Sequence, residues 1–506
     1  MANLPILSLI LSLLITTYPP WTNALPTDIT ATGIRTDPDA IRAASNDYGN
    51  LVHQVPSAVL YPSSINHIVE LIKASCCNYS TPFTIAARGR GHSVRGQAMA
   101  GGGVVVEMGA LSRNGGGIRV SWSPSLGYYA DVGGEEMWAD VLRVGLEQGL
   151  APVSWTDYLY LTVGGTLSNA GISGQSFRHG PQISNVLELD VVTGKGELIT
   201  CSRNMNSELF FGALGGLGQL GIITRARIVL DKAPARARWA RLIYSNFSEF
   251  TRDQEHLIST NVSNYVEGFL ITNESTMDQW RSSFSSPSHQ SDVASLWKKH
   301  RLLYSIELVK YYDNLTANTI DKEFDVILEE LNFIPGLIFR RDVSLVDFLN
   351  RVGNLDDGRE ELEGDDVHPW LNLFIPKSRI HDFYDGVLQN MIPRLTKTPG
   401  LFIFYPLNAK KWDSRMSAVT PDEDAFYNVG FLHSGRADES DVFEQFNNQV
   451  LEFCEQAGIK VKQYLPYHKS REDWIKHFGS KWSIFQQRKM EFYPKMILSP
   501  GHRIFN

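Results

Sequence analysis

The segment Phe83-Thr84-Ile85-Ala86-Ala87 predicts a short strand, and the turn Gly89-Arg90-Gly91-His92-Ser93 follows it closely. Backbone amides in a glycine-rich turn at the end of a strand can bind a pyrophosphate, because glycine lets the main chain approach the anion. Ser93 can donate a further hydrogen bond, and a histidine in such a turn has few packing duties. The turn is therefore a candidate cofactor site, although spacing alone explains His92 equally well as an ordinary surface histidine.

A second candidate site lies at Trp155-Thr156-Asp157-Tyr158-Leu159, where one acid stands among large aromatic and aliphatic residues. Such an acid is either a buried structural partner or a general base, and spacing alone favours the structural role. The glycine- and hydroxyl-rich segment 162–171 comes next and suits close approach to a phosphate-bearing cofactor. Residues 216–221 match the G-x-G-x-x-G fingerprint, but a predicted helix precedes them and a strand follows. That inverted order indicates a tight helix-to-strand connection rather than a dinucleotide loop.

The regular elements predicted around these motifs are short strands and helices. Asp37-Pro38 predicts a helix start, and Ser63-Ser64 cap a second helix whose apolar residues recur at helical spacing. Composition changes near residues 232–234: glycine is dense before this point, and longer, more aromatic and more helical segments follow, so we place a domain boundary there. Strands are expected at 103–108, 128–132, 186–192, 197–201 and 221–230, and helices at 135–147, 324–331, 441–457 and 471–492.

Composition excludes several classes of protein. The chain has 506 residues, of which 43% are hydrophobic and 20% charged, so disorder, collagen and coiled coil are excluded. The net charge is −8 and no basic tail or stripe is present, so we expect no nucleic acid partner. The sequence contains no His-Glu-x-x-His and no Cys-x-x-Cys, and we therefore expect no metal.

The first 24 residues predict a signal peptide. They contain no charged side chain, and the apolar run from Leu4 to Ile15 is shorter than the ~20 residues that a membrane span needs. We expect cleavage after Thr22-Asn23-Ala24 and no later membrane span. The four cysteines read as buried free thiols, with one bridge as the alternative. Five Asn-x-Ser/Thr sequons support a secreted glycoprotein, and they begin at Asn78, Asn246, Asn261, Asn273 and Asn314.

An ordered set of motifs covers nearly the whole chain after the leader. This set resembles the flavin-dependent oxidases of the vanillyl-alcohol-oxidase (VAO) type and, more closely, the plant cytokinin dehydrogenases. The motifs are Pro56-Ser57-Ala58-Val59, the turn 89–93, the segments 155–159 and 161–174, Phe177-Arg178-His179-Gly180-Pro181-Gln182, Tyr265-Val266-Glu267-Gly268, His368-Pro369-Trp370-Leu371-Asn372, Tyr405-Pro406-Leu407-Asn408 and Leu498-Ser499-Pro500-Gly501.

The resemblance implies a two-domain α+β fold and an FAD cofactor. The FAD-binding domain would comprise residues 25–232 and 465–506, and a substrate-binding cap of a sheet and helices would comprise 233–464. His92 matches the covalent attachment point of FAD. Related enzymes that attach flavin by two bonds use a cysteine near the glycine-rich segment that follows, and residues 155–174 contain none, so a single bond is expected. The resemblance places further FAD contacts at Gly89, Arg90, Gly91, Ser93, Gln97, Asp157, Thr162, Ser168, Ile172, Ile222, Tyr464 and His502, the last standing where the family usually has glutamine.

The resemblance also implies the reaction. The substrate would be an adenine with an unsaturated side chain on its exocyclic amine, that is, a cytokinin. Asp157 would take the amine proton, with Glu267 as its companion, while hydride leaves the neighbouring carbon for the flavin. The imine would hydrolyse to adenine and an aldehyde. The matching substrate-pocket residues are Val352, Leu355, Trp370, Asn372, Leu432 and Leu465.

The remaining expectations concern partners, location and alternatives. We expect a quinone or oxygen as electron acceptor, a monomer, and secretion to the apoplast, with the vacuole or endoplasmic reticulum as other destinations. One alternative is another FAD-linked oxidase of this fold that acts on sugars or alcohols. The other is a catalytically dead glycoprotein that binds the hormone, against which the presence of both His92 and Asp157 argues.

Overall fold

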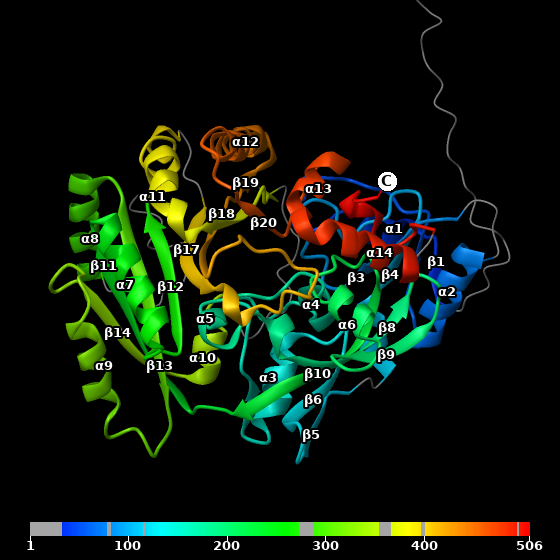
Figure 1. Cartoon of the computed structure of the whole chain (residues 1–506), viewed down its shortest axis with the longest axis horizontal. Coiled ribbons are helices and arrows are strands. Elements are labelled where there is room, and N and C mark those ends of the chain that lie inside the picture. The colour runs from blue at the N-terminus through cyan, green and yellow to red at the C-terminus, as the bar shows by residue number, and fades with distance from the viewer. Residues whose placement is uncertain are drawn as a thin grey trace, which may run out of the picture.

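The computed structural model describes residues 33–77, 82–114, 117–272, 287–353, 366–395, 400–492 and 495–505. Its helices and sheets are arranged in two parts that lie side by side, and the C-terminal helices return to the first part (Figure 1). The α+β fold class predicted from the sequence is confirmed. No helix within these described ranges is long and apolar enough to cross a membrane. The predicted leader, residues 1–24, lies outside them.

The first part opens with a four-stranded sheet of order β1-β2-β4-β3, in which β4 pairs in parallel with both β2 and β3. Helix α1 begins as its sequence predicts: Pro38 is at its start and the Asp37 carboxylate caps it by accepting from the Ala40 amide at 3.2 Å. The elements are β1 Ile34–Arg35, α1 Pro38–Ala44, β2 Ala58–Leu60, α2 Ile65–Cys77, β3 Ile85–Arg88 and β4 Val104–Glu107.

A second, antiparallel sheet of order β5-β6-β10-β8-β9 completes the first part, with β7 paired to β10. The glycine motif at 216–221 joins helix α6 to strand β10, which confirms the helix-to-strand interpretation. The elements are β5 Arg119–Ser123, β6 Gly127–Gly133, α3 Trp138–Leu146, β7 Leu150–Pro152, α4 Val163–Leu167, α5 Ser176–His179, β8 Val186–Thr193, β9 Leu198–Ser202, α6 Ser207–Ala213 and β10 Gly221–Lys232.

The second part is built on an eight-stranded sheet of order β14-β11-β13-β12-β17-β18-β16-β20. Its strands are β11 Arg236–Tyr244, β12 Tyr265–Ile271, β13 Leu303–Tyr312, β14 Ile338–Ser344, β16 Leu371–Pro376, β17 Leu401–Asn408, β18 Ala425–Leu432 and β20 Lys462–Tyr464, and β15 Asp366–Val367 pairs separately with β19 Gly435–Arg436. The helices are α7 Phe247–Thr260, α8 Pro287–His300, α9 Ile320–Glu329, α10 Leu345–Leu349, α11 Ile380–Phe383 and α12 Ser440–Gln456.

The two faces of this sheet pack in different hydrophobic cores. Val266 and Leu270 of β12 pack in a core with residues of α7, α9, α11 and α12. Tyr265 and Phe269 belong instead to the core that contains Trp155 of the first part. Because side chains alternate along a strand, Glu267 shares the face of Tyr265 and Phe269. The sheet therefore presents Tyr265 and Glu267 toward the first part.

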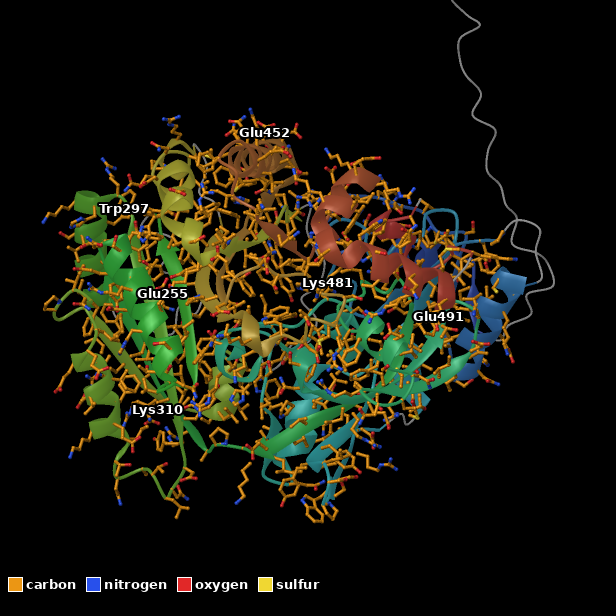
Figure 2. The ribbon with its side chains drawn as sticks, viewed as in Figure 1. Glu255, Trp297, Lys310, Glu452, Lys481 and Glu491 are labelled. Atoms are coloured by element: carbon orange, nitrogen blue, oxygen red, sulfur yellow. The ribbon has the colours of Figure 1, made fainter. Side chains whose placement is uncertain are left out.

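The stretch 471–492 was predicted as one helix, and that prediction is wrong in one respect. The structure forms α13 Arg471–Phe478 and α14 Trp482–Phe492, separated by Gly479 with φ +55°. Glycine adopts this left-handed conformation without the strain that a Cβ brings, so it ends α13. In the turn that follows, the Lys481 ammonium donates to the carbonyls of Met416 at 2.8 Å and Ala418 at 2.6 Å (Figure 2).

The C-terminal segment pairs with the strand that leads into the glycine-rich turn. The Ile85 amide donates to the Ile497 carbonyl at 2.7 Å, and the Ser499 amide donates to the Ile85 carbonyl at 2.9 Å. This contact brings residues 497–499 to β3, which is an edge strand of the first sheet. The division into 25–232, 233–464 and 465–506 stays a prediction. Strand β10 ends at Lys232 and β11 begins at Arg236, on either side of the first proposed boundary.

The described cysteines Cys76, Cys201 and Cys454 are buried, and Cys201 and Cys454 are free thiols, as the first of the two sequence interpretations expects. The side chain of Cys77 lies outside the described residues.

Candidate active site

The turn 89–93 directly follows β3, which ends at Arg88. A Cβ on Gly89 would lie 2.2 Å from Thr162 Oγ1, and a Cβ on Gly91, whose φ is +67°, would lie 2.4 Å from the Arg88 guanidinium. Both positions therefore require glycine. Ser93 Oγ donates to the buried Asp47 carboxylate at 2.7 Å. In this structure the Ser93 hydroxyl thus braces the turn.

His92 stands in a stack of aromatic rings. Its imidazole lies 3.9 Å from the Tyr48 ring, which stacks in turn on His368 at 4.1 Å, and the Trp370 indole lies 5.8 Å from His92. Burial lowers the pKa of His92 to about 4, so its imidazole is neutral at neutral pH and one ring nitrogen keeps its lone pair. The structure thus brings a predicted cofactor residue, His92, next to a predicted substrate residue, Trp370.

Asp157 and Glu267 lie at one site, as a shared role requires. The Tyr265 hydroxyl donates to Asp157 Oδ1 at 2.9 Å and is also in hydrogen-bond contact with Glu267 Oε2. Glu267 is fully buried. The two acids come from different parts of the fold, since Asp157 is on a loop of the first part and Glu267 is on β12. Tyr265 therefore links the two predicted catalytic residues across the junction.

Two arginines and a third acid complete this cluster, and sequence reasoning missed all three. Arg351 Nη2 lies 2.8 Å from Asp157 Oδ1 and 3.8 Å from Glu267 Oε2, while its Nε lies 3.7 Å from Glu307 Oε2. Glu307, on β13, pairs in register with Glu267 on β12 and with Arg241 on β11. Arg241 Nη2 lies 3.2 Å from Glu307 Oε1. We call these five residues the acid cluster: Asp157, Glu267, Glu307, Arg241 and Arg351.

Tyr464 and two other residues predicted to contact flavin or substrate lie near one another. Tyr464 on β20 is opposite Asn372 on β16 and stacks on Phe374 at 5.4 Å. Burial raises the pKa of Tyr464 to about 12, and backbone hydrogen bonds from Gly171 and Ile172 act in the opposite direction. Ile172, Tyr464 and Asn372, predicted to contact flavin or substrate, are therefore near one another.

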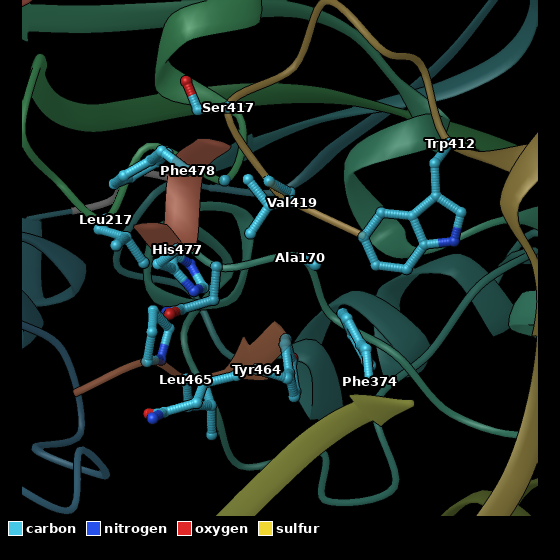
Figure 3. Close-up of a pocket in the computed structure, with 15 residues that line it drawn as sticks. Ala170, Leu217, Phe374, Trp412, Ser417, Val419, Tyr464, Leu465, His477 and Phe478 are labelled. Atoms are coloured by element: carbon cyan, nitrogen blue, oxygen red, sulfur yellow. The ribbon is translucent and has the colours of Figure 1, made fainter. Parts of the chain in front are cut away.

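Tyr464 and Leu465 line a cavity at the junction of the two parts (Figure 3). The wall opposite them is largely aromatic and apolar, and it includes Trp412, Val419 and Phe478. Leu465 itself has φ +55°, an uncommon conformation for a leucine. The cavity therefore adjoins predicted flavin and substrate contacts.

The other predicted residues lie at separate places. Ser168 Oγ donates to the Gly164 carbonyl at 2.7 Å, and Gln97 Oε1 accepts from the Arg95 amide at 2.8 Å. Ile222 packs in a cluster with Ile85 and Leu498, and His502 packs against Trp474. Gly430 and Leu432 of β18 lie beside Asn372: a Cβ on Gly430 would be 2.8 Å from Asn372 Oδ1 and 3.7 Å from Leu432 Cδ2. Val352 follows Arg351 in the chain, and Leu355 lies outside the described residues.

The residues present fit a flavin. His92 offers a neutral ring nitrogen close to the predicted substrate residues. Among the described residues, His502 Nδ1 and both amide atoms of Gln182 are buried without a hydrogen-bond partner. The resemblance predicts His502 as a flavin contact, and Gln182 ends the matching motif 177–182. Buried polar atoms of this kind are expected where a polar ligand completes the site.

Two solved structures share this architecture. A VAO-type flavoprotein from Myceliophthora thermophila has a TM-score of 0.66 at 13% identity, over 88% of this chain and 79% of that one. The 6-hydroxy-D-nicotine oxidase of Arthrobacter nicotinovorans has a TM-score of 0.65 at 17% identity, over 92% and 95%. The chain therefore has the fold of the VAO-type flavoproteins.

Sequence comparison is more specific. The family described as "FAD binding domain" matches residues 56–202, and the family described as "Cytokinin dehydrogenase 1, FAD and cytokinin binding" matches 234–505. Cytokinin dehydrogenase 3 of Arabidopsis thaliana is 50% identical over 96% of this chain and 92% of its own. Cytokinin dehydrogenase 5 of Oryza sativa subsp. japonica is 50% identical over 93% and 90%. The chain belongs to the cytokinin dehydrogenase family of FAD-dependent oxidoreductases.

Proposed function

We propose that the enzyme removes the unsaturated side chain from the exocyclic amine of adenine-type cytokinins and releases adenine and an aldehyde. The observation that carries this proposal is the pairing of Asp157 with Glu267 at the junction of the two parts. Residues matching the family's base and its companion converge there on one hydroxyl, that of Tyr265. The proposed reaction needs a base that takes the amine proton, and Asp157 is a carboxylate at this junction.

The chain's own residues would act on the proton and on the developing charge. Asp157 accepts a hydrogen bond from the exocyclic amine and takes its proton. Bound FAD supplies the acceptor for the hydride that leaves the neighbouring carbon. Three carboxylates and two guanidinium groups leave the acid cluster with one net negative charge when all are ionised. That charge stabilises the positive charge which grows on the substrate carbon and nitrogen as hydride departs.

The rest of the substrate would bind between the Trp370 indole and β16. Trp370 Nε1 is buried and has no acceptor among the described residues. An acceptor nitrogen of a purine would satisfy this N–H group. Asn372, Leu432 and Leu465 would line the same space, and Val352 and Leu355 would close it.

FAD would be attached through one covalent bond to His92. The neutral imidazole supports this assignment, because a nitrogen with a free lone pair is the nucleophile that such a bond needs. Gly89 and Gly91 support it too, since they let the turn pack closely on Thr162 and Arg88. A quinone or oxygen would reoxidise the flavin, and the enzyme would act as a monomer.

Anaerobic reduction tests the proposed function. The purified protein should be yellow, and its oxidised flavin absorbance should bleach on addition of isopentenyl-adenine without oxygen. A hexose or a simple alcohol at the same concentration should leave the spectrum unchanged. Bleaching by the hexose or alcohol alone would point to the sugar- or alcohol-oxidase alternative. A colourless protein that binds isopentenyl-adenine would point to the hormone-binding alternative.

Secretion and N-glycosylation are a further proposal, with the apoplast as the main destination and the vacuole or endoplasmic reticulum as alternatives. Asn246, Asn261 and Asn314 are all exposed, which glycosylation requires; Asn78 and Asn273 lie outside the described residues. Expressed in plant cells, the protein should lose mass on enzymatic deglycosylation and begin near Leu25. Asn314→Gln should lower the mass of the glycosylated protein by that of one glycan. A product that begins at Met1 and keeps its mass would contradict the proposal.

A further inference from the structure

Arg351 is a buried cation to which the proposed reaction gives no individual role beyond its share of the cluster charge. It follows helix α10, which lies near the junction of the two parts (Figure 1). Its side chain is only 3% exposed. The guanidinium carbon lies 4.3 Å from the centre of the Phe348 ring and 4.8 Å from that of Tyr265. The group is therefore held between two aromatic rings, with Nη2 directed at Asp157 and Nη1 donating to the Phe348 carbonyl at 3.1 Å.

Burying the Arg351 guanidinium costs free energy unless carboxylates nearby balance its positive charge. Removing one member of a buried ion pair leaves an uncompensated charge in a medium of low dielectric constant. Asp157, Glu267 and Glu307 all lie within 4 Å of a nitrogen of this one guanidinium. Arg241 contacts Glu307 from the far side. Among the described residues, Arg351 is thus a cation in direct contact with Asp157.

The neighbouring hydroxyls do not change this charge balance. Groups that face Arg351 and Asp157 from other elements are Tyr265 and Glu267 on β12, Glu307 and Tyr311 on β13, Arg241 on β11, Tyr405 on β17 and Tyr464 on β20. Burial raises the pKa of Tyr311 and Tyr405 above the ordinary value, so these phenols stay neutral. Burial alone would lower the pKa of Arg351, but Tyr265 and the three carboxylates raise it above its ordinary value. The balance therefore depends on carboxylates and arginines.

We propose that Arg351 is the positioning residue of Asp157. Its Nη2 fixes the orientation of the carboxylate that accepts the amine proton, and its positive charge offsets the repulsion among the three acids packed around it. Arginine suits this task because its planar fork contacts several oxygens at once and stays charged. The inference rests on the proposed function, in which Asp157 is the base.

The test is anaerobic stopped-flow reduction of the flavin-containing enzyme by isopentenyl-adenine between pH 5 and 9. Arg351→Met should lower the limiting reduction rate roughly 10²-fold, the loss expected when a reacting group is misplaced. The pH at which the reduction rate of this variant increases should be higher than in the wild type. Loss of a neighbouring positive charge makes a carboxylate harder to ionise. Arg351→Lys keeps the charge and should recover part of the rate with the wild-type pH profile. The half-saturating substrate concentration should change far less than the rate.

Arg488→Met is the matched control. Arg488 is also buried and ion-paired, with its Nε 2.9 Å from Glu208, but it lies in the first part and is not in the acid cluster. This variant should lose stability and keep the reduction rate per bound flavin. If Arg351→Met also reduces within a few-fold of wild type with the same pH profile, Arg351 is only structural and the proposal is overturned.

A second variant covers the case in which Arg351→Met does not fold. Arg351→Met combined with Glu307→Gln keeps one net negative charge in the cluster and removes the contact with Asp157. We expect this double variant to fold and its flavin to be reduced slowly. A flavin reduction rate equal to that of the wild type would overturn the proposal. Failure of the proposed function looks different, because the wild-type flavin would then not be reduced by isopentenyl-adenine at all.

Discussion

Flavin reduction by isopentenyl-adenine is expected to slow by ~10²-fold or more in Asp157→Asn, with the fold and the covalent flavin retained. Asparagine keeps the shape of the side chain and its oxygen can still accept from Tyr265 and Arg351, but it cannot take the amine proton. A positioned general base typically contributes ~10²–10⁴-fold in rate. Anaerobic stopped-flow spectroscopy at equal flavin content measures the effect directly.

Asp253→Asn is the control for this substitution. Asp253 is likewise a buried aspartate with a tyrosine partner, since it accepts from the Tyr244 hydroxyl at 3.0 Å, but it lies on α7 in the opposite core. It should cost stability and leave the reduction rate unchanged. An Asp157→Asn enzyme that reduces within a few-fold of wild type would make Asp157 a structural acid, and Glu267 would be the next candidate for the base.

His92→Ala is expected to abolish the covalent link to flavin completely while the protein still folds and holds FAD loosely. Alanine has no ring nitrogen to bond, whereas the glycine-rich turn and its packing on Thr162 remain. The measurement is flavin fluorescence of the protein band after a denaturing gel, which wild type should show and His92→Ala should lack.

His368→Ala provides a close comparison for His92→Ala. His368 stacks on the other face of the same Tyr48 ring, so its removal disturbs the stack but leaves the proposed attachment point intact. This variant should keep the fluorescent band. Release of all flavin from denatured wild-type protein would show that no covalent bond exists.

Local features of this fold were predictable because their causes lie close together in the sequence. The Asp37-Pro38 cap of α1 and the helix-to-strand connection at 216–221 each depend on a few adjacent residues. The break at Gly479 was missed, although its cause is equally local. A single glycine within an otherwise helical pattern does not show from sequence alone whether it will adopt a positive φ.

The candidate site was predictable only where a motif marked it. Asp157 and Glu267 stand in quotable motifs, so the resemblance found them. Arg351 carries no motif, and its contact with Asp157 spans 194 positions of sequence. Glu307 and Arg241 meet because β11, β13 and β12 pair in one register, which a single sequence does not reveal. The sequence thus indicated the two acids, and only the tertiary structure showed the arginines that lie against them.

The pairing of residues 497–499 with β3 has a consequence for biosynthesis. Strand β3 is an edge of the first sheet until this late segment covers it, and an uncovered edge is a surface on which other chains can add. Leu498, the partner of Ile85, is synthesised 413 positions later (498 − 85), so β3 stays uncovered while the chain between them is made. During that interval the strand leading into the His92 turn is exposed to misassembly.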